Sequence, residues 1–112
     1  MDDPIATMEM MAVHPDGTRA PLIVEIGKPY SVDTEEWACP VSLKPLYPRL
    51  PDQHGVDSMQ ALCLALSLVF DLLSNFKEKG GALQYEEGEE FSINSYGFGR
   101  FKPIIQDDPT DE

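Results

Sequence analysis

Positively charged residues are scarce in this sequence. Its 112 residues include 8 Lys and Arg against 20 Asp and Glu, which gives a formal net charge of −12 at pH 7. Six of the acids lie at the two ends, and without their six negative charges the rest still carries −6. Negative charge repels phosphate groups. We therefore expect neither a nucleic acid nor an anionic membrane as a partner, and we expect a basic protein surface to be attracted. Solubility alone also accounts for such acidity.

Cysteine and histidine are also scarce, with two of each. No CxxC, HxxxH or EF-hand spacing occurs, so we expect no metal site, no cofactor and no catalytic residue. His14 and His54 are predicted to be solvated loop residues, because neither has a nearby partner at catalytic or metal spacing. Cys39 is expected on the inward face of a strand, and Cys63 lies in an apolar run where it is predicted to be buried.

A secretory signal is missing at the N-terminus. The first residues, Met-Asp-Asp-Pro, have neither the basic stretch nor the apolar stretch that such a signal needs. We therefore expect a cytoplasmic protein, and at this point the redox state of Cys39 and Cys63 stays open.

The composition is otherwise that of a folded protein, with 42% hydrophobic and 25% charged residues. Its length predicts one domain over residues 1–103, followed by a disordered acidic tail at 104–112. Residues 5–14 and 18–26 alternate apolar and polar groups around a Pro-Asp-Gly turn and predict a β-hairpin. Residues 36–43 predict a third strand, in which Pro40 requires an edge position or a bulge.

Residues 59–76 contain no Gly or Pro and predict one long helix, capped by Asp57 or Ser58 and ended by Gly80 and Gly81. Thirteen of these 18 residues are apolar. A helix that rests on a sheet with one side needs fewer apolar residues than this. The set expected to face the sheet is Met59, Leu62, Leu66, Val69, Leu73 and Phe76. A second set comprises Ala61, Leu64, Ala65, Leu68 and Leu72.

The second apolar side of this helix has two interpretations. Strands and loops of the same chain can wrap it, or a second chain can cover it through the dimer-interface candidates Leu64, Leu68 and Leu72. A membrane span is not expected, because polar residues such as Asp71 interrupt the run.

The segment after the helix predicts a second hairpin, with strands at 82–85 and 91–96 around an acidic turn. The predicted fold is therefore α+β, with an antiparallel sheet packed on one long central helix. That sheet combines an N-terminal three-stranded meander with the C-terminal hairpin. Exposed aromatic residues among acids are typical of surfaces that recognise basic partners. The predicted partner-binding residues are Tyr85, Glu86, Glu87, Glu89, Glu90, Tyr96 and Phe98.

Two sequence patterns support a resemblance. Trp37-Ala38-Cys39-Pro40-Val41 and the helix start Gly55-Val56-Asp57-Ser58-Met59-Gln60-Ala61-Leu62 resemble a family of small bacterial single-domain proteins of unknown function over residues 5–85. In size, charge and hairpin-helix layout the chain is also similar to the acidic immunity proteins that accompany bacterial toxins.

Two functions are therefore expected. The first is a non-enzymatic acidic binding protein that docks onto or neutralises a basic protein partner, with a toxin as one such partner. The alternative is a self-associating structural or accessory domain that forms a homodimer through the second side of the helix.

Overall fold

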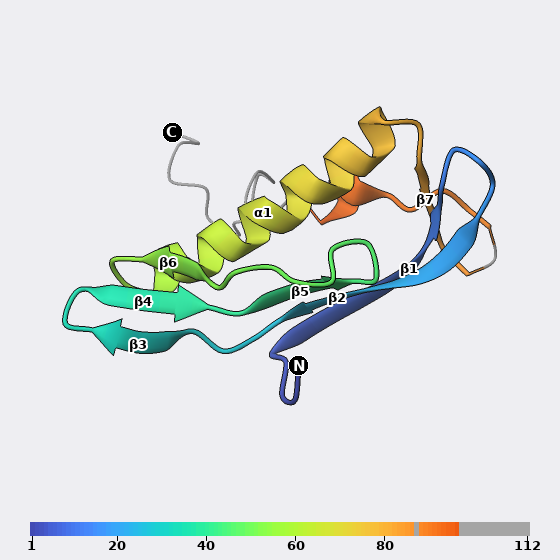
Figure 1. The fold of residues 1–112 in the computed structure, drawn as a ribbon. Coiled ribbons are helices and arrows are strands. Elements are labelled where there is room, and N and C mark those ends of the chain that lie inside the picture. The colour runs from blue at the N-terminus through green and yellow to red at the C-terminus, as the bar shows by residue number, and fades with distance from the viewer. Residues whose placement is uncertain (87, 97–112) are drawn as a thin grey trace, which may run out of the picture.

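Two antiparallel sheets pack against one long central helix, so the fold is α+β as predicted (Figure 1). The structure is a computed structural model, and it describes residues 1–86 and 88–96. The strands are β1 (Ala6–Val13), β2 (Arg19–Ile26), β3 (Tyr30–Asp33), β4 (Glu36–Cys39), β5 (Val41–Lys44), β6 (Gln53–Gly55) and β7 (Ala82–Gln84), and the helices are α1 (Ser58–Glu78) and the short 3-10 helix η1 (Ile93–Ser95). The predicted domain limit at residue 103 and the acidic tail lie outside the described residues.

The predicted hairpin forms the centre of the larger sheet, whose strand order is β5-β2-β1-β7. In β2, Leu22, Val24 and Ile26 are buried against the helix side, whereas Ile23 is 40% exposed on the opposite face. The turn is closed by the amide of Thr18, which donates to the Asp16 carboxylate over 2.9 Å. The alternation in the sequence therefore identified the buried face of this strand correctly.

The predicted third strand is divided at Pro40 between the two sheets. β4 lies at the centre of the smaller sheet, with order β3-β4-β6, and β5 lies at the edge of the larger one. Proline has no amide hydrogen to donate to a neighbouring strand. Its carbonyl still accepts from the amide of Gly27 over 2.9 Å, close to where the chain changes sheets.

Three elements differ from the prediction. Neither β3 nor β6 was expected from the sequence. Both strands are too short for the period-2 pattern to be recognisable, and pairing with β4 stabilises them. The predicted strand at 91–96 is wrong, because this segment forms η1 and only an isolated bridge joins Gln84 to Glu90.

Helix α1 begins and ends where the sequence predicts. The Asp57 carboxylate caps it by accepting from the amide of Gln60 over 2.8 Å, and the Gln60 side chain accepts from the amide of Val56 over 2.7 Å. At the other end Gly80 has φ of +97°, and the amide of Gly81 donates to the carbonyl of Phe76 over 3.0 Å. This pattern is the Schellman motif, which favours glycine at the left-handed position.

The buried face of α1 differs from the predicted one at the start of the helix. Its buried residues are Ala61, Ala65, Val69, Leu73 and Phe76. Met59, predicted to face the sheet, is 66% exposed. The small alanines lie at the start of the helix, where the backbone comes so close to β6 that a Cβ atom on Gly55 would lie 2.7 Å from the amide nitrogen of Ala61.

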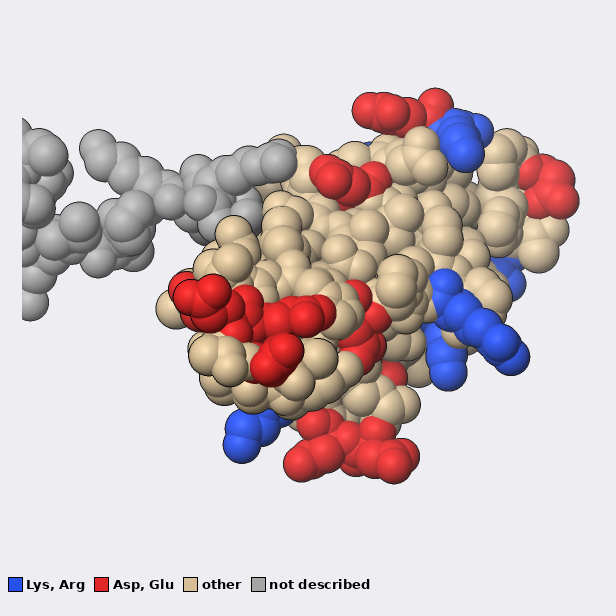
Figure 2. Space-filling model, turned by 60° about the vertical axis from the view of Figure 1, so that its left-hand side comes forward, with Lys and Arg blue, Asp and Glu red and all other residues tan. Residues whose placement is uncertain are grey.

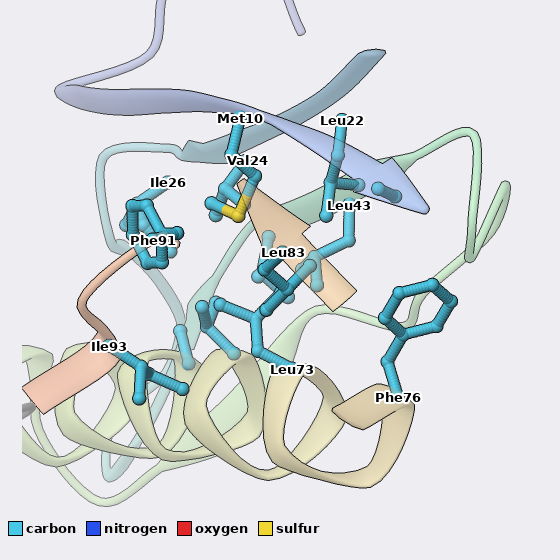
Figure 3. Close-up of a cluster of buried hydrophobic side chains, with 14 of the residues drawn as sticks. Met10, Leu22, Val24, Ile26, Leu43, Leu73, Phe76, Leu83, Phe91 and Ile93 are labelled. Atoms are coloured by element: carbon cyan, nitrogen blue, oxygen red, sulfur yellow. The ribbon is translucent and has the colours of Figure 1, made fainter. Parts of the chain in front are cut away.

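The core lies between α1 and the larger sheet and is closed by the segment after β7 (Figure 3). Leu83, Phe91 and Ile93 fill the space above the helix, and Leu73 projects toward them. Partly buried leucines flank the buried face of α1, namely Leu62, Leu66, Leu68 and Leu72. By length and composition alone α1 could span a membrane, a criterion that core helices of folded domains also meet.

The burial of side chains along α1 gives the first prediction. Leu73→Ala should lower the free energy of unfolding by about 2 to 5 kcal/mol, because Leu73 is completely buried and the deletion leaves a cavity. The control is Leu64→Ala on the same helix, where the side chain is 41% exposed and the loss should be below about 1 kcal/mol. Urea unfolding of both variants measures the difference, and equal losses would contradict this assignment of the buried face.

Candidate functional site

The acidic turn after β7 presents its described carboxylates to solvent. Glu86, Glu89 and Glu90 are exposed. The turn is closed by two backbone hydrogen bonds, from the amide of Tyr85 to the carbonyl of Glu89 at 2.7 Å and from the amide of Gly88 to the carbonyl of Tyr85 at 2.9 Å. These bonds hold the three glutamates around one short loop. Glu87, also predicted to bind a partner, lies outside the described residues.

Two tyrosines flank this acidic turn and rest on one buried ring. The ring of Phe91 is 1% exposed and lies 5.3 Å from the ring of Tyr85 and 5.2 Å from the ring of Tyr96, measured between centroids. The Tyr96 ring is nearly parallel to it and remains 46% exposed. The core thus supports two surface tyrosines beside the glutamates. Phe98, the last predicted binding residue, lies outside the described residues.

The charges of the turn are only weakly compensated. Lys77 forms an ion pair with Glu90 over 3.5 Å, and the Glu90 side chain is 78% exposed, so solvent screens the attraction. Within the described part of the chain, Glu86 and Glu89 have no ion pair. Figure 2 shows further Asp and Glu side chains in several separate groups on the face that it presents, so acidity is not confined to this turn.

The predicted dimer-interface residues differ in their exposure to solvent. Leu64 is 41% exposed, whereas Leu68 and Leu72 are partly buried and pack against the core. The same chain therefore covers much of the second apolar side of α1. Leu64 remains the most accessible of the three.

A polar pair on the smaller sheet was missed by the sequence analysis. His54 lies on β6, and its Nδ1 is 2.7 Å from Oε2 of Glu36 on β4, with both side chains about half exposed. Tyr30 lies on the same face, where its hydroxyl donates to Asp52 and this bond raises the pKa of Tyr30. His54 thus lies on a strand and not in the predicted loop, because the pairing of β4 with β6 was not recognised from the sequence.

The second histidine lies beside an aromatic ring of the core. His14 packs edge-on against Phe76, with ring centroids 5.3 Å apart. No group of three His, Cys, Asp or Glu side chains suitable for a metal ion occurs within residues 1–86 and 88–96.

The two cysteines have opposite environments, and both are free thiols. Cys39 is completely buried, and burial raises the pKa of its thiol, with a further increase from the Asp52 carboxylate. Cys63 is exposed on α1, so the prediction that it is buried is wrong. It lies on the side of the helix that turns away from the sheets.

Comparison with known proteins gives one match. The model of a family described as a domain of unknown function (DUF6968) matches residues 7–99. No curated protein and no solved structure matches the chain. The match confirms the predicted resemblance to a family of unknown function and gives no information about the likeness to immunity proteins.

The cysteine environments give the second prediction. In the native protein a disulfide reagent such as DTNB should modify one thiol rapidly, because Cys63 is accessible and Cys39 is both buried and held in its protonated form. Cys63→Ser should abolish the rapid phase, and Cys39→Ser should leave it unchanged. Absorbance of the released thiolate, with and without denaturant, counts the thiols. Two rapid thiols in the native protein would contradict the burial of Cys39.

Proposed function

We propose that this chain, which belongs to the DUF6968 family of domains of unknown function, is a non-enzymatic acidic binding protein that docks onto a basic protein partner. The binding surface consists of the acidic turn (Glu86, Glu89 and Glu90) and the flanking tyrosines, Tyr85 and Tyr96.

The observation that carries this proposal is the combination of uncompensated carboxylates with core-supported aromatic rings. Glu86 and Glu89 are exposed and have no ion pair in the described part of the chain. Exposed charges of one sign accelerate association with an oppositely charged surface. Tyr85 and Tyr96 are held by Phe91, so they lose little conformational freedom when a partner covers them. The glutamates would control the association rate and the tyrosines the dissociation rate.

The proposed setting is the cytoplasm, and a basic toxin is one class of partner that such a protein would neutralise. Binding masks a basic partner surface without any reaction on it. The net charge of −12 opposes nucleic acids and anionic membranes as alternative ligands.

The third prediction concerns charge at the turn. Once crosslinking of the full chain in its native cells has identified a basic partner, changing Glu86, Glu87, Glu89 and Glu90 to Gln should slow association, as measured by stopped-flow mixing. Raising the salt concentration from 0.1 M to 1 M should have the same effect, because the Debye length falls from ~10 Å to ~3 Å. Tyr96→Ala should instead accelerate dissociation.

The matched control removes four negative charges elsewhere. Changing Asp107, Asp108, Asp111 and Glu112 to their amides alters the net charge equally but leaves the turn intact. This control should slow association much less than the four changes at the turn. Equal effects of the two variants would show that net charge, and not the turn, attracts the partner.

A homodimer is the second candidate function, favoured by the exposure of Leu64 on an apolar helix. The partial burial of Leu68 and Leu72 leaves a small area for such an interface. A dimer of this kind would cover Leu64 and would need no basic partner.

The fourth prediction separates the two functions. Light scattering should show a monomer whose mass does not depend on concentration, because most of the second apolar side of α1 is covered by the same chain. Leu64→Glu should leave this mass unchanged. If the protein is a dimer that Leu64→Glu dissociates without unfolding it, the self-associating function would replace the acidic binding protein.

A further inference from the structure

The edge of β1 is only partly covered by a neighbouring strand. β1 pairs with β2 along its whole length, whereas β7 pairs on the other side with Met11, Ala12 and Val13 alone. Within residues 1–86 and 88–96, no strand pairs with Ala6–Met10 on that side. Among the described strands, the edge of β1 is therefore open over five of its eight residues.

The direction of the backbone groups at this edge follows from the hairpin. The amide of His14 donates to the carbonyl of Thr18 over 2.8 Å, so His14 and Thr18 are a hydrogen-bonded pair. In an antiparallel ladder such pairs alternate. The even-numbered residues of β1 therefore bond to β2, and Thr7 and Glu9 direct their N–H and C=O groups toward the open edge. Pairing of β7 with Met11 and Val13 follows the same alternation.

An apolar hollow of about 300 Å³ runs along the first half of this edge. It touches residues 6–8 of β1 and also Ile26 of β2, so it lies on the inner face of the sheet beside the open part of β1. Its other walls include Val24 of β2, Leu66 and Val69 of α1, and the ring of Tyr96. The hollow thus lies between the open edge of β1 and the side of the helix.

A second hollow of about 300 Å³ continues along the same strand. It touches residues 9–11 together with Pro21 and Glu86 of the acidic turn. Glu9 lies on the outer face of β1, opposite to the face of Met8, which points toward the helix. The carboxylates of Glu9 and Glu86 therefore line the outer side of the edge, and apolar groups line its inner side.

We propose that the open edge of β1 binds an extended segment of the basic partner as an added antiparallel strand. The backbone of the segment would pair with Thr7 and Glu9. Side chains on its inner face would be apolar, because they would enter the hollow beside Met8 and Leu66. Side chains on the outer face of the segment would be Lys or Arg, because they would lie beside Glu9. Neighbouring side chains of opposite charge on two strands stabilise the pairing of those strands.

Charge and backbone chemistry distinguish this occupant from two others. A second copy of the chain adding through its own β1 would bring the two Glu9 carboxylates close together in a register centred on Met8 or Glu9, and like charges on neighbouring strands are destabilising. A small apolar ligand would leave the N–H and C=O groups of Thr7 and Glu9 unused. An alternating apolar and basic strand satisfies the apolar hollow, the carboxylates and the backbone groups together.

The inference rests on the proposed function and specifies how the partner is recognised. Glu86 belongs both to the acidic turn and to the second hollow, and Tyr96 both flanks that turn and lines the first hollow. The proposed binding surface is therefore continuous with the open edge.

The experiment uses the full chain and a synthetic hexapeptide of alternating valine and lysine, acetylated and amidated at its ends. In antiparallel addition the lysines pair with Thr7 and Glu9, so their amides point toward β1 and those of the valines point away. N-methylation of the lysine amides should therefore weaken binding about tenfold or more, whereas N-methylation of the valine amides should have little effect. Calorimetry measures the affinities, and a valine–glutamate hexapeptide should not bind.

A protein variant tests the same geometry from the other side. Thr7→Pro removes an amide that points toward the open edge and none that bonds to β2, so the thermal midpoint should change little while peptide binding falls about tenfold. Amide hydrogen exchange of the unmodified protein should show new protection at Thr7 and Glu9 when the peptide is bound.

Two results would overturn strand addition: no binding of the valine–lysine peptide, or equal binding of the two methylated peptides. The methylated peptides give this answer even if Thr7→Pro fails to fold. If a basic partner binds with the expected salt dependence but is insensitive to Thr7→Pro, the acidic binding function stands and the β1 edge is not its site. If no basic partner binds, the proposed function itself fails.

Discussion

The close contact between Gly55 and the first turns of α1 determines how the rest of the structure is arranged. A side chain on Gly55 would collide with the backbone of Ala61, so the helix can start this close to β6 only because Gly55 has no Cβ atom. This contact fixes how closely the first turns of α1 approach the smaller sheet. Ala61 and Ala65 then face the smaller sheet, and Val69, Leu73 and Phe76 continue along the same side into the larger core.

The local elements could be predicted from the sequence, and their long-range arrangement could not. The hairpin, the Asp57 cap and the glycine end of α1 depend on residues that are near one another in the chain. The predicted buried face of α1 was right for Val69, Leu73 and Phe76. It was wrong at the start of the helix, because the 3-4 spacing of the stripe led through Met59 and Leu62, whereas Ala61 and Ala65 are buried there. A close helix–sheet contact requires alanine at the contact and leucine at its flanks. Pro40 was recognised as a disruption, but its consequence, a strand divided between two sheets, depends on the distant partners β2 and β6.

The candidate site was predictable to a similar extent. Acids around a glycine turn indicate an exposed loop in any fold, and Glu86, Glu89 and Glu90 lie in one. The support that Phe91 gives to Tyr85 and Tyr96 required the structure, because the segment expected to be a strand contains η1 instead. The pair formed by His54 and Glu36 and the open edge of β1 arise from strand pairing between distant residues, and no local pattern carries that information.

The half-open edge of β1 also has a consequence for handling this protein. An unpaired strand edge can template pairing between identical chains, which leads to aggregation, and charged side chains are one means by which natural sheets prevent it. Here the protection is electrostatic and comes from the net negative charge of the chain. Near the sequence pI of about 4.3 the repulsion between copies disappears. Acidic buffers would therefore expose the protein to self-assembly through the edge that its charge protects at neutral pH.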